Sequence, residues 1–179
     1  MKREQKMMTF KHALLPLDGS SLAEHALPYA KAIYQEGARI TLLQVVDLPV
    51  IPPDVDATVF GLPPGTRADP YLREQAETYL WKVRSEFQTS FASITTEVID
   101  STDPSGAIIA FSDENAVDLI VMVTHGRSGL SRWLMGSMTQ KVLQAAACPV
   151  LVVTRRLIET ESQGLPVVET ASDIPETAT

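Results

Sequence analysis

The sequence contains one cysteine, Cys148, so no disulfide can form within the chain. Proteins that work in a reducing compartment use cysteine in this sparing way, and we expect a cytoplasmic protein. Apolar stretches are short as well, and none approaches the roughly 20 residues that a membrane-spanning helix needs. The charged N-terminus is not followed by a signal-type apolar region. The sequence therefore predicts no association with a membrane.

An excess of positive charge is also missing. Lys and Arg number 15 against 22 Asp and Glu, a net charge of −7, and five of the acidic residues follow Arg156, which leaves −2 for the rest. A nearly neutral globule has no electrostatic basis for binding DNA or RNA. We expect a flexible N-terminus over residues 1–8, one domain over residues 9–156, and an acidic, disordered tail over residues 157–179.

Two common phosphate-binding loops are absent. The sequence has no run of Gly, four residues and Gly-Lys-Ser/Thr, which a Walker A loop requires. The turn after the first apolar run, Asp18-Gly19-Ser20-Ser21, lacks the Gly-x-Gly-x-x-Gly fingerprint of dinucleotide-binding folds. Any anion site in this chain must be of a third kind.

Short apolar runs alternate with segments of helical spacing along the chain. Strands are expected at residues 12–17, 40–46, 94–99, 119–123 and 150–153, with helices at about 22–36, 70–91, 104–115 and 138–147. Ser21 and Glu24 have the spacing of a capping box for the first helix, which Pro28 interrupts and Gly37 ends. The pattern predicts an α/β fold, an open parallel five-stranded sheet with helices on both faces. Residues 47–69, rich in proline, form a long loop that could act as a lid or a partner surface.

The segment after the fourth expected strand is the most informative one. A glycine-bearing loop with Gly126 leads to Gly136-Ser137 and then to a helix capped by Ser137. The first N–H groups of a helix lack internal partners and carry positive charge, and glycine lets an anion approach the backbone. The arrangement suits a phosphate, but it is equally compatible with a plain strand-to-helix connection. In an open parallel sheet this segment would meet Asp18 where the strand order reverses.

At this point the residues resemble the universal stress protein family, over approximately residues 9–154. Pro16-Leu17-Asp18-Gly19-Ser20 is similar to the family's first strand and turn, and Val45-Val46-Asp47 to the end of its second strand. The family's ATP-binding pattern is matched in register by a glycine, nine intervening residues and a Gly-Ser pair, which here are Gly126 and Gly136-Ser137. The first glycine of that pattern falls on Val123, a β-branched residue that narrows the site. Residues 148–153 resemble the closing strand.

The resemblance implies a binding site for ATP, with Mg or Mn as an accompanying cation. Asp18 would lie near the ribose or that cation, and Pro16 and Val45 would line the adenine slot. Arg127 would neutralise phosphate charge. The phosphates would be held by the glycines, N–H groups and hydroxyls of Gly126, Gly136, Ser137 and Thr139. The neighbouring residues of the site would be Leu17, Met122, Val123 and Met138.

The resemblance further implies a regulatory or stress-response module that binds ATP without substantial turnover. It would form a homodimer through the apolar last strand, Val150 to Val153, which is expected at an open sheet edge. Two alternatives stay open: a dimerisation module of the same family with an altered pocket, and an enzyme of related fold that cleaves ATP. The Ser-Gly-Gly-x-Asp-Ser loop of such enzymes is absent. We expect the pocket to tolerate Val123, with the valine methyls turned toward apolar packing.

Overall fold

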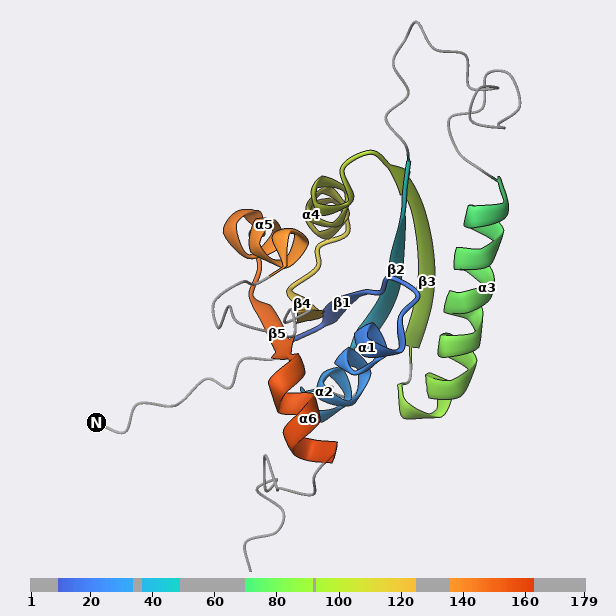
Figure 1. The fold of residues 1–179 in the computed structure, drawn as a ribbon. Helices are drawn as coiled ribbons and strands as arrows, with labels where there is room; N and C mark the ends of the chain where they lie inside the picture. The colour runs from blue at the N-terminus through green and yellow to red at the C-terminus, as the bar shows by residue number, and fades with distance from the viewer. Residues whose placement is uncertain (1–9, 34–36, 49–69, 92, 125–135, 163–179) are drawn as a thin grey trace, which may run out of the picture.

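The structure, a computed structural model, describes residues 10–33, 37–48, 70–91, 93–124 and 136–162. Its centre is a five-stranded sheet in the order β3-β2-β1-β4-β5, and every pairing in it is parallel (Figure 1). The strands are β1 (His12–Pro16), β2 (Arg39–Asp47), β3 (Ser93–Ser101), β4 (Leu119–Thr124) and β5 (Val150–Thr154). The predicted parallel α/β fold is confirmed, and the two edge strands are the alternating β3 and the apolar β5.

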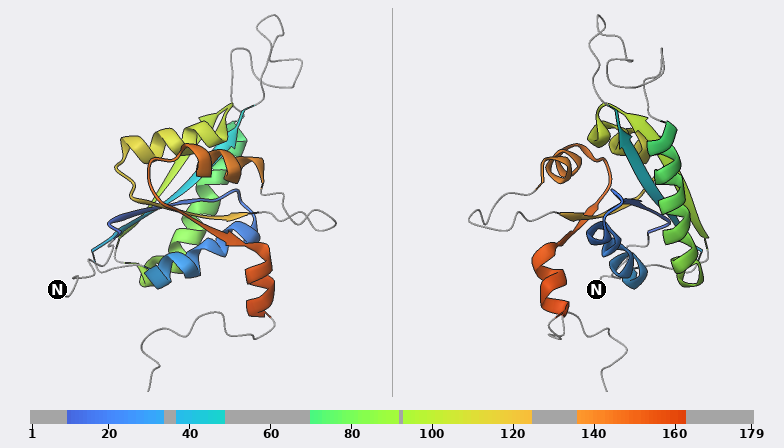
Figure 2. Two further views of the ribbon diagram at one scale, coloured as in Figure 1. Left: turned by 90° about the vertical axis from the view of Figure 1, so that its left-hand side faces the viewer. Right: turned by 45° about the vertical axis from the view of Figure 1, so that its right-hand side comes forward.

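Helices cover both faces of this sheet (Figures 1 and 2). One face carries α1 (Ser21–Glu24), α2 (Ala26–Ile33), α3 (Pro70–Phe87) and α6 (Arg155–Ser162), and the other carries α4 (Pro104–Glu114) and α5 (Ser137–Ala145). A 3₁₀ turn (Gln88–Ser90) follows α3. Among the described residues, no helix combines the length and the apolar character that crossing a bilayer requires.

The side chains of each inner strand alternate between two hydrophobic cores. In β4, Val121 and Val123 pack on the α1, α2, α3 and α6 side, whereas Ile120 and Met122 pack on the α4 and α5 side. All of β4 is buried because helices cover both of its faces. The near-continuous apolar run that predicted this strand is the sequence signature of such burial.

The first helical segment differs in detail from the prediction. Its N-cap is Ser20, whose side chain accepts a hydrogen bond from the Ala23 N–H, and not the expected Ser21. The helix divides at His25 into α1 and α2. Pro28 explains the division, because it has no N–H to donate to the carbonyl of Glu24 and its ring crowds that carbonyl. Gly37, the expected end of this helical segment, adopts a left-handed φ of 85°, but α2 is described only to Ile33, and residues 34–36 lie outside the described residues.

A helix, α6, spans the expected domain boundary at residue 156. Helix α6 follows β5 directly and continues to Ser162, and its Ile158 is only 6% exposed against the core. The expected flexible N-terminus, most of the 47–69 loop and the tail beyond Ser162 lie outside the described residues, as do Gly126 and Arg127.

A buried polar network lies at the N-terminal ends of the strands. His12, 4% exposed, places Nε2 2.8 Å from the Thr41 hydroxyl and Nδ1 2.8 Å from an Arg39 guanidinium nitrogen. Nδ1 also lies 3.0 Å from the backbone carbonyl oxygen of Asn115, which can only accept a hydrogen bond. Burial lowers the pKa of His12 and the positive charge of Arg39 lowers it further, and together they outweigh the opposing hydrogen bond to Asn115 and the charge of Asp118.

Candidate functional site

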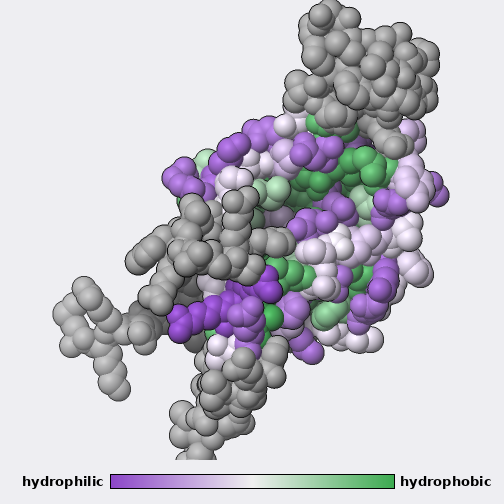
Figure 3. All heavy atoms as spheres, viewed as in Figure 1, coloured by the Kyte–Doolittle hydropathy of each residue, from purple (hydrophilic) through white to green (hydrophobic). Residues whose placement is uncertain are grey.

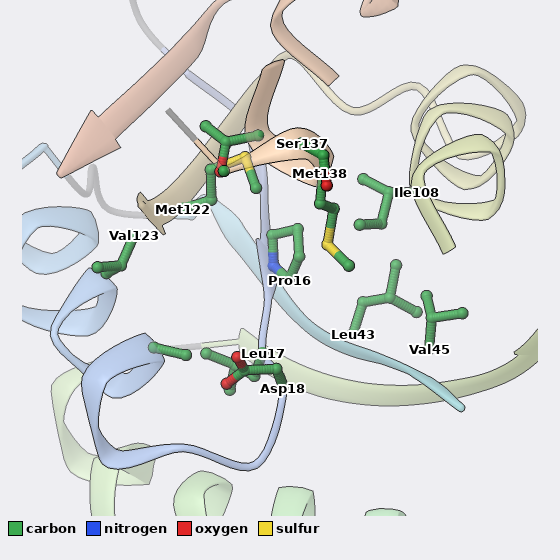
Figure 4. A pocket seen from close by; sticks show the side chains of 13 residues that line it. Pro16, Leu17, Asp18, Leu43, Val45, Ile108, Met122, Val123, Ser137 and Met138 are labelled. Carbon is green, nitrogen blue, oxygen red and sulfur yellow. The ribbon is translucent and has the colours of Figure 1, made fainter. Parts of the chain in front are cut away.

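A cavity of about 210 Å³ opens at the carboxyl ends of β1 and β4 (Figure 4). These two strands are neighbours, but the chain continues from β1 toward β2 on one side and from β4 toward β5 on the other. Strand order therefore reverses between them, and loops leave a crevice at such a point in open parallel sheets. The location is the one that the sequence predicted.

One part of the cavity is apolar. Pro16 at the end of β1 lies opposite Leu43 and Val45 of β2 and Ile108 of α4, and the Met138 side chain extends between them (Figure 4). On the face in Figure 3, hydrophobic residues are exposed in the region between α4 and β2 and are surrounded by polar residues. Leu43 and Ile108 were not predicted. Leu43 could have been found, because it lies two residues before Val45 and so shares its face of the strand.

The opposite part of the cavity is the beginning of α5. Gly136, not the expected Ser137, is the N-cap, so this helix starts without a side-chain cap. The N–H of Gly136 donates to the Thr124 hydroxyl at 3.4 Å. Gly136, Ser137, Met138 and Thr139 all line the cavity. The uncapped first turn presents backbone donors and the positive end of the helix dipole to this space.

The β1–α1 turn supplies the only carboxylate among the described lining residues, that of Asp18. Asp18 Oδ1 accepts hydrogen bonds from the Ser20 N–H at 3.0 Å and from the Ser20 hydroxyl at 2.6 Å. Gly19 between them has a φ of 83°, a left-handed conformation that favours glycine. Because Ser20 also caps α1, the same residue fixes the helix and the orientation of the Asp18 carboxylate.

Val123 borders the cavity at the end of β4 but turns its methyls away from the apolar slot. The residue is 8% exposed and belongs to the core beneath α1 and α2, together with Leu17 and Ala23 (Figure 4). This orientation agrees with the expectation that the methyls face apolar packing. A ligand that approached the main chain at the end of this strand would meet the Val123 Cβ, where the family pattern has a glycine.

The cavity does not by itself provide a metal site. Among the described residues, no group of three or more His, Cys, Asp or Glu side chains is placed to hold a metal ion. Mg²⁺ in proteins is commonly held by one or two carboxylates and by substrate phosphates. Asp18 therefore fits a cation that arrives with a phosphate ligand, and does not fit a resident metal.

The structure brings ten of the twelve predicted site residues to this one cavity, and the other two, Gly126 and Arg127, lie outside the described residues. Ala23 also lines it and was not predicted. The ten residues come from β1 and its turn, β2, β4 and α5, which are far apart in the sequence. They are Pro16, Leu17, Asp18, Val45, Met122, Val123, Gly136, Ser137, Met138 and Thr139.

Known proteins are similar to this chain both in sequence and in fold. Universal stress protein MJ0531 of Methanocaldococcus jannaschii is 33% identical over 150 residues, covering 82% of this chain and 83% of the relative. A universal stress protein of Thermus aquaticus is 35% identical over 147 residues, covering 80% and 98%. The solved structure of MJ0577 superposes with a TM-score of 0.66 at 27% identity, covering 83% and 98%.

Two more distant structures share the fold and hold ligands. One is a universal stress protein in complex with cAMP, at 18% identity and a TM-score of 0.58, covering 82% of this chain and 98% of the other. The second, from Archaeoglobus fulgidus in complex with dAMP, has 19% identity and a TM-score of 0.54, covering 81% and 98%. The family model for universal stress proteins matches residues 9–154, from the segment before β1 to the end of β5. With the sheet order, the crevice and these relatives in agreement, the chain belongs to the universal stress protein family.

Proposed function

We propose that the cavity binds an adenine nucleotide, ATP, and that the protein is a regulatory or stress-response module that does not turn the nucleotide over substantially. One observation carries the proposal. A single cavity joins an apolar slot to the uncapped N-terminus of α5, and the Asp18 carboxylate lies beside it.

The apolar slot has the chemistry that a purine base requires. Pro16, Leu43, Val45 and Ile108 offer aliphatic surface for a flat aromatic ring, and the flexible Met138 side chain can adapt to it. A carboxylate next to the slot can accept hydrogen bonds from ribose hydroxyls, and Asp18 is in that place. The base and sugar would therefore occupy the side of the cavity formed by β1, β2 and α4.

The phosphates would lie at the beginning of α5. Ordinary N-cap side chains accept hydrogen bonds from the first-turn N–H groups, and the glycine at position 136 cannot do so. Those donors and the helix dipole are available to an anion. Ser137 and Thr139 add hydroxyl groups on the same turn.

The ligands of two family members support an adenine nucleotide as the ligand class. cAMP and dAMP, found in two structures of the same fold, both consist of adenine, a sugar and one phosphate. That common part matches the apolar slot, the Asp18 carboxylate and the α5 N-terminus. The remaining phosphates of ATP would extend beyond the N-terminus of α5, and Gly126 and Arg127, which the resemblance assigns to them, lie outside the described residues.

The described lining residues offer little for catalysis. They include no His, Cys, Lys or Tyr, and Asp18 is the one acid–base group among them. Its Oδ1 is engaged by two hydrogen bonds from Ser20. A general base must reach the proton that it removes, and this carboxylate is held for orientation instead. These features favour retention of the nucleotide over its cleavage.

Purification of the protein from cells, denaturation and identification of the released nucleotide tests the proposal. Bound ATP or AMP would support it, and calorimetry should then give micromolar affinity for ATP, on the order of −8 kcal/mol. Protein that carries no nucleotide and binds none in calorimetry would favour the alternative of a family module with an altered pocket. Rapid turnover of radiolabelled ATP would favour the enzyme instead.

We also propose that the protein forms a homodimer through β5. Two strands lie at the edges of the sheet, and β3 carries exposed polar side chains, Thr95 and Glu97, that discourage pairing. In β5, Val150, Leu151 and Val152 are apolar and only half-buried. An apolar edge with unpaired backbone groups is stabilised by a second copy related by two-fold symmetry.

A further inference from the structure

The described part of the chain contains three sulfur atoms, and they differ in exposure. Met138 is 40% exposed, whereas Met122 is 4% exposed and Cys148 is partly buried. Both methionines line the cavity proposed for the nucleotide, but Met122 belongs to the core on the α4 and α5 side of the sheet. Met138, the second residue of α5, is therefore the sulfur of these three that a small solute reaches most easily.

The Met138 side chain lies in the apolar slot that the adenine base would enter. Figure 4 shows its thioether between Pro16 on one side and Leu43 and Ile108 on the other. A thioether is polarisable and makes favourable contacts with aromatic rings. A base in this slot would therefore pack against the Met138 sulfur and cover it.

We propose that Met138 is a site of reversible oxidation by hydrogen peroxide, and that its sulfoxide weakens nucleotide binding; this second part rests on the proposed function. The thioether sulfur attacks one oxygen of the peroxide and the O–O bond breaks. The proton of the transferred hydroxyl passes to the departing hydroxide, which leaves as water. The sulfur gains one oxygen and loses two electrons, and the peroxide is reduced. Methionine sulfoxide reductases restore the thioether.

The sulfoxide makes a wall of the apolar slot polar. Its oxygen is a hydrogen-bond acceptor on a chiral, polar group, whereas the thioether is only a weak acceptor. The neighbouring side chains of Pro16, Leu43 and Ile108 have no donor to offer it. If the sulfoxide stays in the slot, a bound base leaves its oxygen buried without a partner, and if it turns into solvent, the base loses that wall. Both responses weaken binding of the base.

The other two sulfur atoms are less reactive for physical reasons. Burial raises the pKa of the Cys148 thiol, which lowers the fraction of thiolate, the form that reacts with peroxide. Met122 is shielded by the core in which it packs. Since both methionines line the same cavity, Met122 is an internal reference that differs from Met138 mainly in exposure.

Brief treatment of the full-length protein with hydrogen peroxide, followed by peptide mass spectrometry, tests the modification. We expect Met138 sulfoxide to form about tenfold faster than Met122 sulfoxide, because oxidation follows exposure. ATP at about ten times its Kd should slow the oxidation of Met138 about tenfold, since only the free protein then exposes the sulfur. Treatment with the two methionine sulfoxide reductases should return the Met138 peptide to its original mass.

Calorimetry with ATP before and after the peroxide treatment tests the effect on binding. The oxidised parent should bind ATP about tenfold more weakly than the reduced parent, and the reductases should restore the affinity. Met138→Leu has a similar volume and no sulfur to oxidise, while Met122, Cys148 and every other methionine remain. Its ATP affinity before peroxide and after peroxide should agree. Met138→Gln places a polar group in the slot without oxidation and should bind more weakly than Met138→Leu.

Four results would overturn the proposal: equal oxidation rates of Met138 and Met122, no protection by ATP, unchanged ATP affinity after full conversion of Met138, or the same loss of affinity in Met138→Leu as in the parent. The reduced parent separates these failures from failure of the proposed function. If it binds no adenine nucleotide, the proposed function and the effect on binding are both refuted, and the oxidation rates of Met138 and Met122 still decide the modification site.

Discussion

Gly136 allows the phosphate assignment to be tested without disturbing the fold. Its φ of −55° and ψ of 144° are accessible to any L-residue, and a Cβ there would come no closer than 4.0 Å to the Thr139 hydroxyl. Asn and Asp are both good N-cap residues and should stabilise α5 by a few tenths of a kcal/mol relative to glycine. Gly136→Asn and Gly136→Asp therefore give two folded proteins of nearly equal shape, which differ by one negative charge.

The difference in ATP affinity between Gly136→Asn and Gly136→Asp shows whether the group bound at the N-terminus of α5 is negatively charged. A carboxylate about 5 Å from a phosphate charge costs about 3 kcal/mol at an effective dielectric constant of 20, and about 1 kcal/mol in water. Since 1.4 kcal/mol corresponds to a factor of ten, we expect Gly136→Asp to bind ATP about 5- to 150-fold more weakly than Gly136→Asn. Both should bind more weakly than the parent, because the new side chain occupies the N–H groups that the phosphate would use.

Isothermal titration calorimetry with ATP and with adenosine completes the test. Adenosine has no phosphate, so the Asn and Asp variants should bind it equally well. Thermal unfolding should show that neither variant is less stable than the parent. Equal ATP affinity in the parent, Asn and Asp proteins would mean that the phosphates do not lie at the beginning of α5, and the reasoning would be refuted.

Three further predictions concern other parts of the molecule. Val123→Gly should tighten ATP binding by up to about tenfold, because it opens the main chain to the ligand, and should destabilise the fold by about 3 kcal/mol through lost packing and backbone entropy. Titration with ATP measures the affinity, and urea unfolding measures the stability. Unchanged ATP affinity would show that Val123 does not restrict nucleotide binding. Since the pKa of His12 is lowered in the folded state, its stabilising contribution is complete above its ordinary pKa near 6.5 and is lost as the pH falls from there toward the folded-state pKa. Urea unfolding across pH 5–8 should show this slope in the parent but not in His12→Gln, and equal slopes would exclude His12 as its source. Val152→Lys should weaken the proposed β5 dimer, and sedimentation that finds the parent only as monomer at micromolar concentration would contradict that dimer.

The five strands were predictable because each one is a local pattern. Four are apolar runs between turn residues, and β3 alternates as expected of an edge strand with one exposed face. The N-cap residues of the helices were less predictable, since two adjacent residues can each have a side chain suited to the N-cap position. Ser20 caps α1 in place of Ser21 because the Asp18 carboxylate already holds its N–H and hydroxyl. That hydrogen-bonded turn is not visible in the spacing of Ser21 and Glu24.

The lining of the candidate site was predictable where motif and topology agree. Asp18, Val45 and Gly136 follow from strand ends and glycines, but Ile108 reaches the cavity from α4 through packing over a long sequence distance. Tyr79 fits the apolar stripe of α3, and only the folded chain brings its hydroxyl to the carboxylate of Glu24 in α1.

Helix α6 shows how a short segment in a polar tail can be held by the fold. Leu157 and Ile158 are too few to produce a recognisable helical period, yet both pack on the core below α1 and α2. Because α6 starts at Arg155, directly after β5, the chain turns from the sheet edge to this face (Figure 1). The contacts of Leu157 and Ile158 are therefore with the face of the sheet, and within the described part of the chain the backbone of β5 pairs with β4 alone. The same turn that anchors α6 therefore keeps this helix off the apolar edge, where the proposed dimer would place a second copy.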